Sequence, residues 1–382
     1  MGFHEFSSPY DWSRIAAYKR TAKAAFGGMI DLSVGSPVDP VPDSVRKALA
    51  VAANDPNAYG YPATAGTADL RAAIAEWFSA TRNVDLQAIH ADVVPTVGSK
   101  EGVALMASLL HFGEDDVVVQ PKVSYPTYEI GTQLAGAQVL KVDDVADVAS
   151  WRNVPGVKAV WVNSPCNPTG EVYSAERMAG IVAAAREIGA VVLSDECYAL
   201  MQWRGATNSA DDDPLQSTPC ALRSDVCAGS AEGVLVLYSL SKQSNMAGYR
   251  TAFIAGDESL IASMSAYRKQ IGQIIPGPVQ AAMAAGLRDL ESVKVQHARY
   301  RERLGVLVSA LRAYGYCTDM PDGALYVWVR AKSGDCWTDM EQLAKIGIIA
   351  SPGEFYGAPE CLRFSATASD EAIASAAERL AL

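Results

Sequence analysis

The sequence has no basic block and no long apolar run. Its 382 residues include 32 lysines and arginines against 43 aspartates and glutamates, a formal net charge of -11. We therefore expect no nucleic-acid partner, because no cluster of cations is present to neutralise phosphates. No uninterrupted apolar run reaches the roughly 18 residues that a membrane span needs, so we expect no membrane partner either. The first residues show neither the basic nor the apolar segment of a secretion signal.

Paired cysteines and clustered histidines are also missing. The seven cysteines are scattered singly with no C-x-x-C pair, which indicates reduced thiols and a cytoplasmic location. The four histidines lie far apart in the sequence, so we expect no metal site. Apolar residues, by contrast, make up 49% of the chain, which is enough for a large core. A chain of this length predicts two domains, or one large domain with a smaller companion.

Short apolar strands alternate with helices through the middle of the chain. Strands of about five residues, apolar throughout, predict an α/β fold with a mostly parallel sheet that helices cover on both faces. In such sheets ligands bind outside the carboxyl ends of the strands. We expect strands at 93–97, 116–120, 157–162, 190–194, 234–240 and 251–255, and helices that begin at Ser99, near Tyr128 and at Ala175.

The segments on either side of this alternation have other patterns. Residues 67–81 have helical apolar spacing, which places Arg82 on the solvent side. Residues 205–232 are rich in Asp, Pro, Ser and Gly, and we expect an exposed loop there, with no assigned role. A long helix near 292–314 precedes expected strands near 324–329 and 361–365. We predict an N-terminal arm with part of a small α+β domain at 1–45, a large domain at 46–290 and the rest of the small domain at 291–382.

Lys242 follows an apolar strand and is flanked by hydroxyl groups. A lysine at the end of a buried strand is partly desolvated, which favours the neutral amine that forms a Schiff base with an aldehyde. Ser239, Ser241 and Arg250 lie close enough in sequence to hold a phosphate beside it. Pyridoxal phosphate carries an aldehyde and a phosphate on one ring. A lone lysine after a strand is usually solvated, however, so the prediction of a cofactor site depends on whether other motifs indicate the same site.

Two further motifs also occur where expected strands end. Thr96-Val-Gly-Ser99-Lys100-Glu joins a strand to a helix, whose first N–H groups can bind an anion, although Ser99 could simply cap the helix. In Asn163-Ser-Pro-Cys-Asn167-Pro-Thr-Gly170 two prolines hold the chain extended, so that Asn167 can face inward. Alone, this second motif is most often a turn.

The last motif is Ser194-Asp195-Glu-Cys-Tyr198, at the end of another apolar strand. A buried carboxylate is costly unless a cation or hydrogen-bond donors meet it. The protonated pyridine nitrogen of the cofactor would be such a cation. An ordinary capping or salt-bridged aspartate is the alternative. Ordinary interpretations would have to hold for all four motifs together, which favours a common site.

A different chemistry also has to be weighed, because Ser239-Leu-Ser-Lys242 matches the S-x-x-K signature of serine acyl transfer. That chemistry would make Ser239 a nucleophile and would require S-D-N and K-T-G motifs. The chain has Lys332-Ser-Gly334 but no S-x-N, and the expected parallel sheet also fits this chemistry poorly.

Together, these residues resemble the fold-type I pyridoxal-phosphate enzymes of the class I and II aminotransferase group over essentially the whole chain. The motifs that carry the resemblance lie at 167–170, 194–198, 239–250 (Ser-Leu-Ser-Lys-x-x-Asn-x-x-Gly-x-Arg) and 362–365 (Leu-Arg-Phe-Ser). The chain is further similar to the actinobacterial type of N-succinyldiaminopimelate aminotransferase, through segments 31–40, 60–66, 98–101, 225–230 and 353–357.

The resemblance implies a role for each site residue. Lys242 would bind the cofactor covalently and move the proton at the substrate α-carbon, and Asp195 would pair with the pyridinium. Arg363 would bind the substrate α-carboxylate through two hydrogen bonds, with Gly35 and Asn167 beside it. The other implied cofactor contacts are Tyr125 on the ring face, Asn167 and Tyr198 at the ring hydroxyl, and Ser99, Lys100, Ser239, Ser241 and Arg250 at the phosphate. Tyr61 would reach the phosphate of the neighbouring subunit of a homodimer.

The implied reaction is a transamination in lysine and diaminopimelate biosynthesis. Glutamate would give its amino group to the cofactor, leaving 2-oxoglutarate, and N-succinyl-2-amino-6-oxopimelate would receive it. Aminotransferases of broader specificity (for aspartate, alanine or LL-diaminopimelate) and a lyase or decarboxylase on the same fold are alternatives. A binding protein without catalysis is disfavoured by the presence of Lys242 and Asp195. The candidates for binding the distal groups of the substrate are Arg14, Arg20, Lys100, Lys122 and Arg330, and Lys100 could instead face the phosphate.

Overall fold

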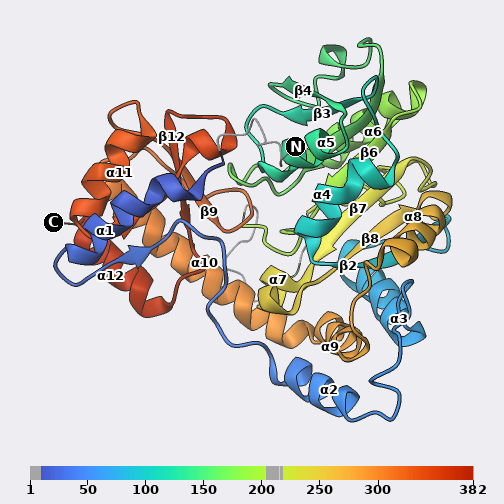
Figure 1. Ribbon diagram of the computed structural model, residues 1–382. Helices are drawn as coiled ribbons and strands as arrows, with labels where there is room; N and C mark the ends of the chain where they lie inside the picture. The colour runs from blue at the N-terminus through green and yellow to red at the C-terminus, as the bar shows by residue number, and fades with distance from the viewer. Residues whose placement is uncertain (1–9, 204–214, 216–217, 382) are drawn as a thin grey trace, which may run out of the picture.

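The computed structural model describes residues 10–203, 215 and 218–381. A seven-stranded sheet forms its larger part, in the order β2-β8-β7-β6-β5-β3-β4 (Figure 1). Among these seven strands β8 alone runs in the direction opposite to the others, so the predicted mostly parallel sheet is confirmed. The strands are β2 (Ala91–Val97), β3 (Val117–Pro121), β4 (Gln138–Val142), β5 (Val157–Asn163), β6 (Val191–Asp195), β7 (Val234–Ser239) and β8 (Thr251–Asp257).

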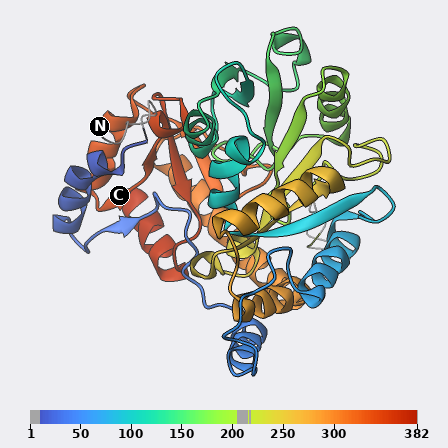
Figure 2. The same cartoon turned by 45° about the vertical axis from the view of Figure 1, so that its right-hand side comes forward.

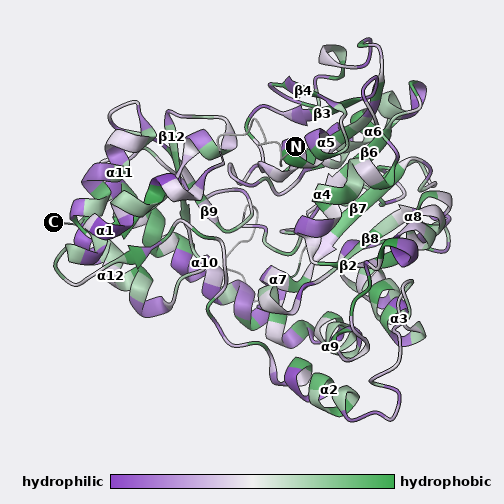
Figure 3. Cartoon of the chain, viewed as in Figure 1, coloured by the Kyte–Doolittle hydropathy of each residue, from purple (hydrophilic) through white to green (hydrophobic). Residues whose placement is uncertain are grey.

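Each central strand is buried on both faces, and its side chains alternate between two cores. On β7, Val234 and Val236 belong to one core while Leu235 and Leu237 belong to the other. This explains why these strands have continuous apolar sequences, which Figure 3 shows as green strands in the middle of the sheet. Strand β4 lies at the edge with several exposed or half-buried residues, and its mixed sequence was not predicted as a strand.

Helices cover both faces of this sheet, and the view in Figure 2 shows α8 lying across β2 and β8. Residues of α3, α6 and α9 pack in one core, and those of α4, α5 and α8 in the other. These helices are α2 (Asp43–Ala53), α3 (Ala68–Trp77), α4 (Ser99–Leu109), α5 (Thr127–Leu134), α6 (Ala175–Glu187), α7 (Leu240–Gln243), α8 (Glu258–Ile271) and α9 (Gly277–Arg288).

A smaller part lies beside the large sheet and is connected to it by the long helix α10 (Leu290–Ala313) (Figure 1). Its core combines the beginning and the end of the chain, because Ile15 and Leu32 pack with Leu343 and Phe364. The predicted domain boundaries themselves stay a prediction. The elements of this part are α1 (Ala16–Ala24), β1 (Ile30–Asp31), β9 (Tyr326–Arg330), α11 (Cys336–Lys345), β10 (Ile348–Ile349), β11 (Ser351–Pro352), β12 (Cys361–Ser365) and α12 (Asp370–Leu380). Strands β11, β12 and β9 form an antiparallel sheet, and β1 pairs with β10.

Arg82 is buried, so the prediction that it faces solvent is wrong. It ends η2 (Phe78–Arg82), the π-helical turn after α3. Its Nη2 donates to Glu196 Oε2 at 2.5 Å, and its Nη1 donates to the carbonyl of Thr218 at 2.9 Å. A buried carboxylate and backbone carbonyls therefore replace the water that a surface arginine would have.

The expectation of an exposed loop at 205–232 is also wrong for much of its length. Cys220, Leu222, Val226 and Ala231 are buried in the core that contains α3 and α6. Glu196 fixes this segment, because its Oε1 accepts a hydrogen bond from the Ala221 amide at 2.8 Å. The acidic run from Asp211 to Pro214 lies outside the described residues.

In the described parts of the chain we find no helix with the length and apolarity needed to cross a bilayer.

Candidate active site

A cavity of about 380 Å³ lies where the carboxyl ends of β5, β6 and β7 face the three-stranded sheet. Every predicted site residue except Tyr61 lines it, so the fold brings together segments from most of the chain. Those residues are Gly35, Ser99, Lys100, Tyr125, Asn167, Asp195, Tyr198, Ser239, Ser241, Lys242, Arg250 and Arg363. Tyr61 is fully exposed, and its predicted contact with a second subunit stays a prediction.

Asp195 is the last residue of β6, is buried and lines the cavity. The Tyr128 hydroxyl donates to its Oδ2 at 2.8 Å and the Cys197 amide donates to its Oδ1 at 3.2 Å. Burial raises the pKa of Asp195, and these hydrogen bonds oppose that rise. Among the described residues no lysine or arginine forms an ion pair with it, so a cationic ring nitrogen would supply the missing counter-charge.

Lys242 lies in the short helix α7, directly after β7. Its Nζ donates a hydrogen bond to the backbone carbonyl of Gly35, from the chain segment that follows β1. Burial lowers the pKa of Lys242, and the positive charges of Arg363 and Arg250 act in the same direction. An amine with a lowered pKa is neutral for more of the time, as a nucleophile or proton acceptor must be.

A third group of residues surrounds the N-terminus of α4. Ser99 is the first residue of this helix, where the leading N–H groups have no partner within the helix. Ser239 Oγ and Ser241 Oγ lie 2.8 Å apart, and both line the same cavity. Gly98 has a φ of 80°, and a Cβ there would overlap the guanidinium of Arg250. Hydroxyls, free amides and a cation in one corner suit a phosphate.

Arg363 on β12 forms the opposite wall. Its Nη1 donates to Asn167 Oδ1 at 2.8 Å and its Nη2 to the Ser33 carbonyl at 2.7 Å. The Nε atom is buried and has no hydrogen-bond partner among the residues that the structure describes. An unpartnered guanidinium N–H in a cavity is suited to a carboxylate, which would satisfy it. The backbone at Asn167 is itself held in place, since its backbone N–H donates to Asn163 Oδ1 at 2.8 Å.

Several residues of this site were missed in the sequence. Tyr128, one helical turn after Tyr125, could have been found by its spacing of three residues. Cys197 and Asn163 were inside quoted motifs, but no role followed from their position. The remaining aromatic residues that line the cavity have no recognisable local sequence signal, because they come from distant segments of the chain. They are Tyr10, Trp12, Tyr326 and Tyr356.

Comparison with known proteins decides the family. Residues 27–380 match the family model described as aminotransferase class I and II. The chain belongs to the class I and II aminotransferases. This aminotransferase has the fold-type I architecture, and its cofactor is pyridoxal phosphate.

Two curated relatives and one solved structure illustrate the similarity. The chain is 40% identical over 373 residues to 4-dedimethylamino-4-oxo-anhydrotetracycline transaminase OxyQ of Streptomyces rimosus, covering 97% of this aminotransferase and 98% of the relative. It is also 40% identical over 377 residues to the probable aminotransferase Rv1178 of Mycobacterium tuberculosis, covering 97% and 84%. A structure of a probable N-succinyldiaminopimelate aminotransferase from Thermus thermophilus superimposes with a TM-score of 0.84 at 27% identity, covering 97% and 99%.

Proposed function

We propose that this aminotransferase transfers the amino group of glutamate to N-succinyl-2-amino-6-oxopimelate, in lysine and diaminopimelate biosynthesis. The observation that carries the proposal is the placement of Lys242, Asp195 and Arg363 around one cavity. Asp195 lacks a cationic partner and Arg363 Nε lacks an acceptor among the described residues. A pyridinium and an α-carboxylate would satisfy them.

Different residues of the cavity would contact different parts of the cofactor. Asp195 would hold the charge on the pyridine nitrogen, Tyr125 would lie on the ring face, and Asn167 and Tyr198 would hydrogen-bond the ring oxygen. The phosphate would be held by Ser99, Ser239, Ser241 and Arg250. When bound there, pyridoxal phosphate supplies an electron sink for the bond that breaks at the substrate α-carbon.

Lys242 would move the proton at that α-carbon. Its burial, together with Arg363 and Arg250, lowers the pKa of the amine, so a neutral acceptor is available at a lower pH than for a surface lysine. Arg363 would hold the α-carboxylate that all donors and acceptors share, which fixes the α-carbon relative to Lys242. Arg363 would thus bind the amino-group donor in the first half-reaction and the acceptor in the second.

Lys100 is the candidate we favour for the distal acidic groups of the substrate. It lines the cavity, whereas Arg14 and Lys122 form ion pairs with Glu354 and Asp143. The lining does not include Arg20 or Arg330. The Lys100 ammonium lies 5.5 Å from the centre of the Tyr10 ring, and Trp12 extends the same wall. An aromatic wall with one cation suits a long substrate with an acidic end.

We also propose that the active protein is a cytoplasmic homodimer. Val51, Tyr59, Tyr61 and Ile271 are exposed apolar or aromatic side chains of the large part. A second copy would cover such residues. Tyr61 would then reach the phosphate corner of its neighbour.

Two measurements test the substrate assignment. Mixing the purified holoenzyme with glutamate in a stopped-flow instrument should convert the bound cofactor to its pyridoxamine form within the first turnover. An unchanged spectrum would contradict glutamate as donor. The acceptor is tested by kcat/KM with and without the succinyl group, where equal values favour the broad-specificity alternative. A Lys100→Met variant should lose the preference while keeping the glutamate half-reaction.

A lyase on the same fold remains the second candidate. It predicts loss of a carbon substituent from the amino acid without accumulation of the pyridoxamine form. Product analysis by mass spectrometry after a single turnover separates the two reactions.

A further inference from the structure

Tyr326, on β9, contacts two residues of the site at once. Its hydroxyl oxygen lies 2.6 Å from the Tyr198 hydroxyl oxygen, and its ring centre lies 4.0 Å from the guanidinium carbon of Arg363. The side chain is buried and lines the cavity. Its hydroxyl and its ring are therefore directed at different parts of the site.

The register of the small sheet produces the contact with Arg363. Arg363 of β12 is paired with Trp328, and Ser365 is paired with Tyr326. Tyr326 and Trp328 are two residues apart and share a face of β9, so Tyr326 is the diagonal neighbour of Arg363. Tyr356 lies 4.8 Å from the same guanidinium carbon. Two aromatic rings therefore pack against this one arginine.

The hydroxyl of Tyr326 is equally constrained. A Cβ atom at Gly35 would overlap it, so the Gly35 segment fits against this tyrosine only because residue 35 has no side chain. The carbonyl of Gly35 accepts the hydrogen bond from Lys242 Nζ. Tyr326 thus contacts the Gly35 segment, Tyr198 and Arg363, the arginine proposed to bind the substrate α-carboxylate.

We propose that Tyr326 is a positioning residue with two separable tasks: its ring holds the Arg363 guanidinium in the orientation that binds the α-carboxylate, and its hydroxyl orients the Tyr198 hydroxyl. The inference rests on the proposed function, in which Tyr198 donates to the ring oxygen of the cofactor. The Tyr198 oxygen can then accept a hydrogen bond from the Tyr326 hydroxyl. Two hydrogen bonds in sequence polarise one another, so Tyr198 becomes a stronger donor.

Other charged or titratable groups also face these atoms. Arg363 and Cys197 act on Tyr198 besides Tyr326 itself. Besides Tyr326, the same two residues and Arg250 act on Lys242. The test therefore needs a variant that leaves these neighbouring groups in place. Tyr326→Phe meets this need, because it removes only the Tyr326 hydroxyl.

Tyr326→Phe tests the hydroxyl. We expect the midpoint of the pH-dependent absorption change of the bound cofactor to move to higher pH, because a weaker Tyr198 donor stabilises the negative ring oxygen less. Tyr198→Phe should move it in the same direction and further, and the double variant should not exceed Tyr198→Phe alone. A midpoint in Tyr326→Phe that equals the wild-type midpoint overturns the proposal.

Tyr326→Leu tests the ring. Glutarate, which has carboxylates but no amino group, should bind to the holoenzyme of this variant more weakly by roughly threefold to thirtyfold, the effect expected of a buried cation–π contact. Tyr326→Phe keeps the ring and should bind glutarate as the wild type does. Equal glutarate affinity in Tyr326→Leu and wild type would overturn the proposal.

Tyr316→Phe is the matched control. It also removes a buried tyrosine hydroxyl of the small part, but that hydroxyl donates to Asp339, away from the cavity. In Tyr316→Phe the pH midpoint of the cofactor absorption and the glutarate affinity should keep their wild-type values. A shift of the midpoint as large as that in Tyr326→Phe would contradict a specific role of Tyr326. Failure of the proposed function has a different signature, because glutamate would then leave the cofactor of the wild-type holoenzyme unconverted, while the cofactor band could still be titrated in the wild type and in each variant.

Discussion

The Tyr128 hydroxyl donates to Asp195 Oδ2 at 2.8 Å, and the Tyr128 ring stacks on Trp161 with 4.5 Å between centres. Helix α5 thus supplies a hydrogen bond to a carboxylate at the end of β6. Burial in this position raises the pKa of Asp195, which disfavours the charged form that a pyridinium requires. The donated hydrogen bond counteracts this effect.

Tyr128→Phe should therefore weaken the cofactor site without removing it. Loss of a hydrogen bond to a charged group costs about 1.5–3 kcal/mol, which corresponds to roughly tenfold to hundredfold weaker cofactor binding. Equilibrium titration of the apoenzyme with pyridoxal phosphate measures this. Tyr267→Phe, which changes a tyrosine outside the cavity lining, is the control and should bind normally. Normal affinity in Tyr128→Phe would show that the hydrogen bond does not support Asp195.

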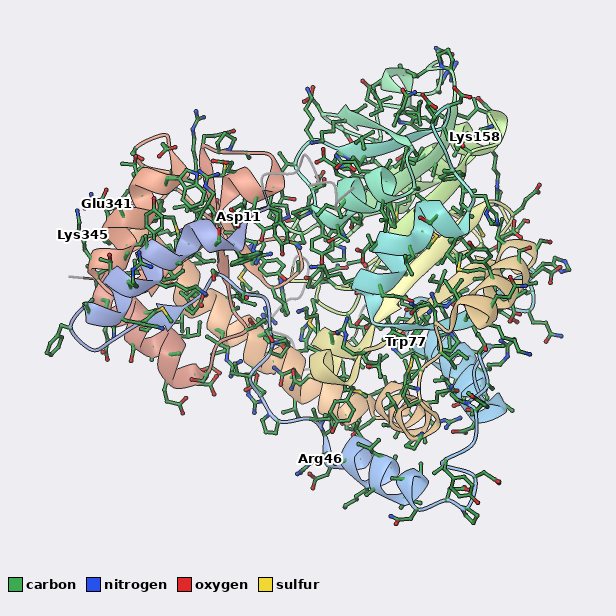
Figure 4. The ribbon with its side chains drawn as sticks, viewed as in Figure 1. Asp11, Arg46, Trp77, Lys158, Glu341 and Lys345 are labelled. Atoms are coloured by element: carbon green, nitrogen blue, oxygen red, sulfur yellow. The ribbon has the colours of Figure 1, made fainter. Side chains whose placement is uncertain are left out.

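Lys242→Ala should abolish multiple turnover. Removing the group that moves the α-carbon proton costs about 10²- to 10⁴-fold in rate when general acid–base catalysis alone is lost. Single-turnover absorption with glutamate measures the remaining rate. Lys158 is an exposed lysine of β5 (Figure 4), and Lys158→Ala should behave as the wild type. Wild-type turnover in Lys242→Ala would remove the proposed mechanism.

The lowered pKa of Lys242 predicts a pH dependence for the apoenzyme. Pyridoxal phosphate reacts with the neutral amine, so the rate of recombination should rise with pH while the ammonium loses its proton. Because the pKa is lowered by burial first and by Arg363 and Arg250 next, the rise should level off below the pH of about 10.4 typical of a free lysine. Rapid-mixing absorption measures the profile. A midpoint at or above that of a model amine would contradict the structure.

Arg363→Lys should weaken α-carboxylate binding although it keeps the charge. Lysine cannot present the planar pair of N–H groups that Nε and an Nη atom offer. We expect KM for glutamate to rise about tenfold to a hundredfold, from the loss of one charged hydrogen bond. Initial-rate kinetics measure this, with Arg152→Lys at an exposed arginine as control. An unchanged KM would place the α-carboxylate elsewhere.

The buried pair of Arg82 and Glu196 predicts a stability effect distinct from catalysis. Both side chains are inaccessible to solvent, so Arg82→Met leaves an unpaired buried carboxylate and should cost about 3–5 kcal/mol. Urea unfolding of the apoenzyme measures the loss. Replacing both residues, with Glu196→Leu added, should cost less than the sum of the single changes. Additive losses would mean that the two charges do not interact.

Much of the large sheet could be predicted from sequence. Strands such as β6 and β7 are apolar throughout because both faces are buried, and their pattern is visible in the sequence alone. The edge strand β4 could not be found in this way, because its half-exposed side chains give a mixed pattern. The predicted solvent exposure of Arg82 was wrong for a related reason. A helical pattern indicates where an arginine usually lies, but it does not reveal a buried partner such as Glu196.

The sequence by itself determined where the chemistry lies along the chain, because Ser99, Asn167, Asp195 and Lys242 each follow an apolar segment and such segments end at one edge of a parallel sheet. Only the tertiary structure decided which groups meet. Arg363 binds Asn167 from 196 positions away, and Tyr326 reaches Tyr198 across 128. Local patterns report the average polarity around a residue, whereas the orientation of a hydrogen bond depends on how distant elements pack.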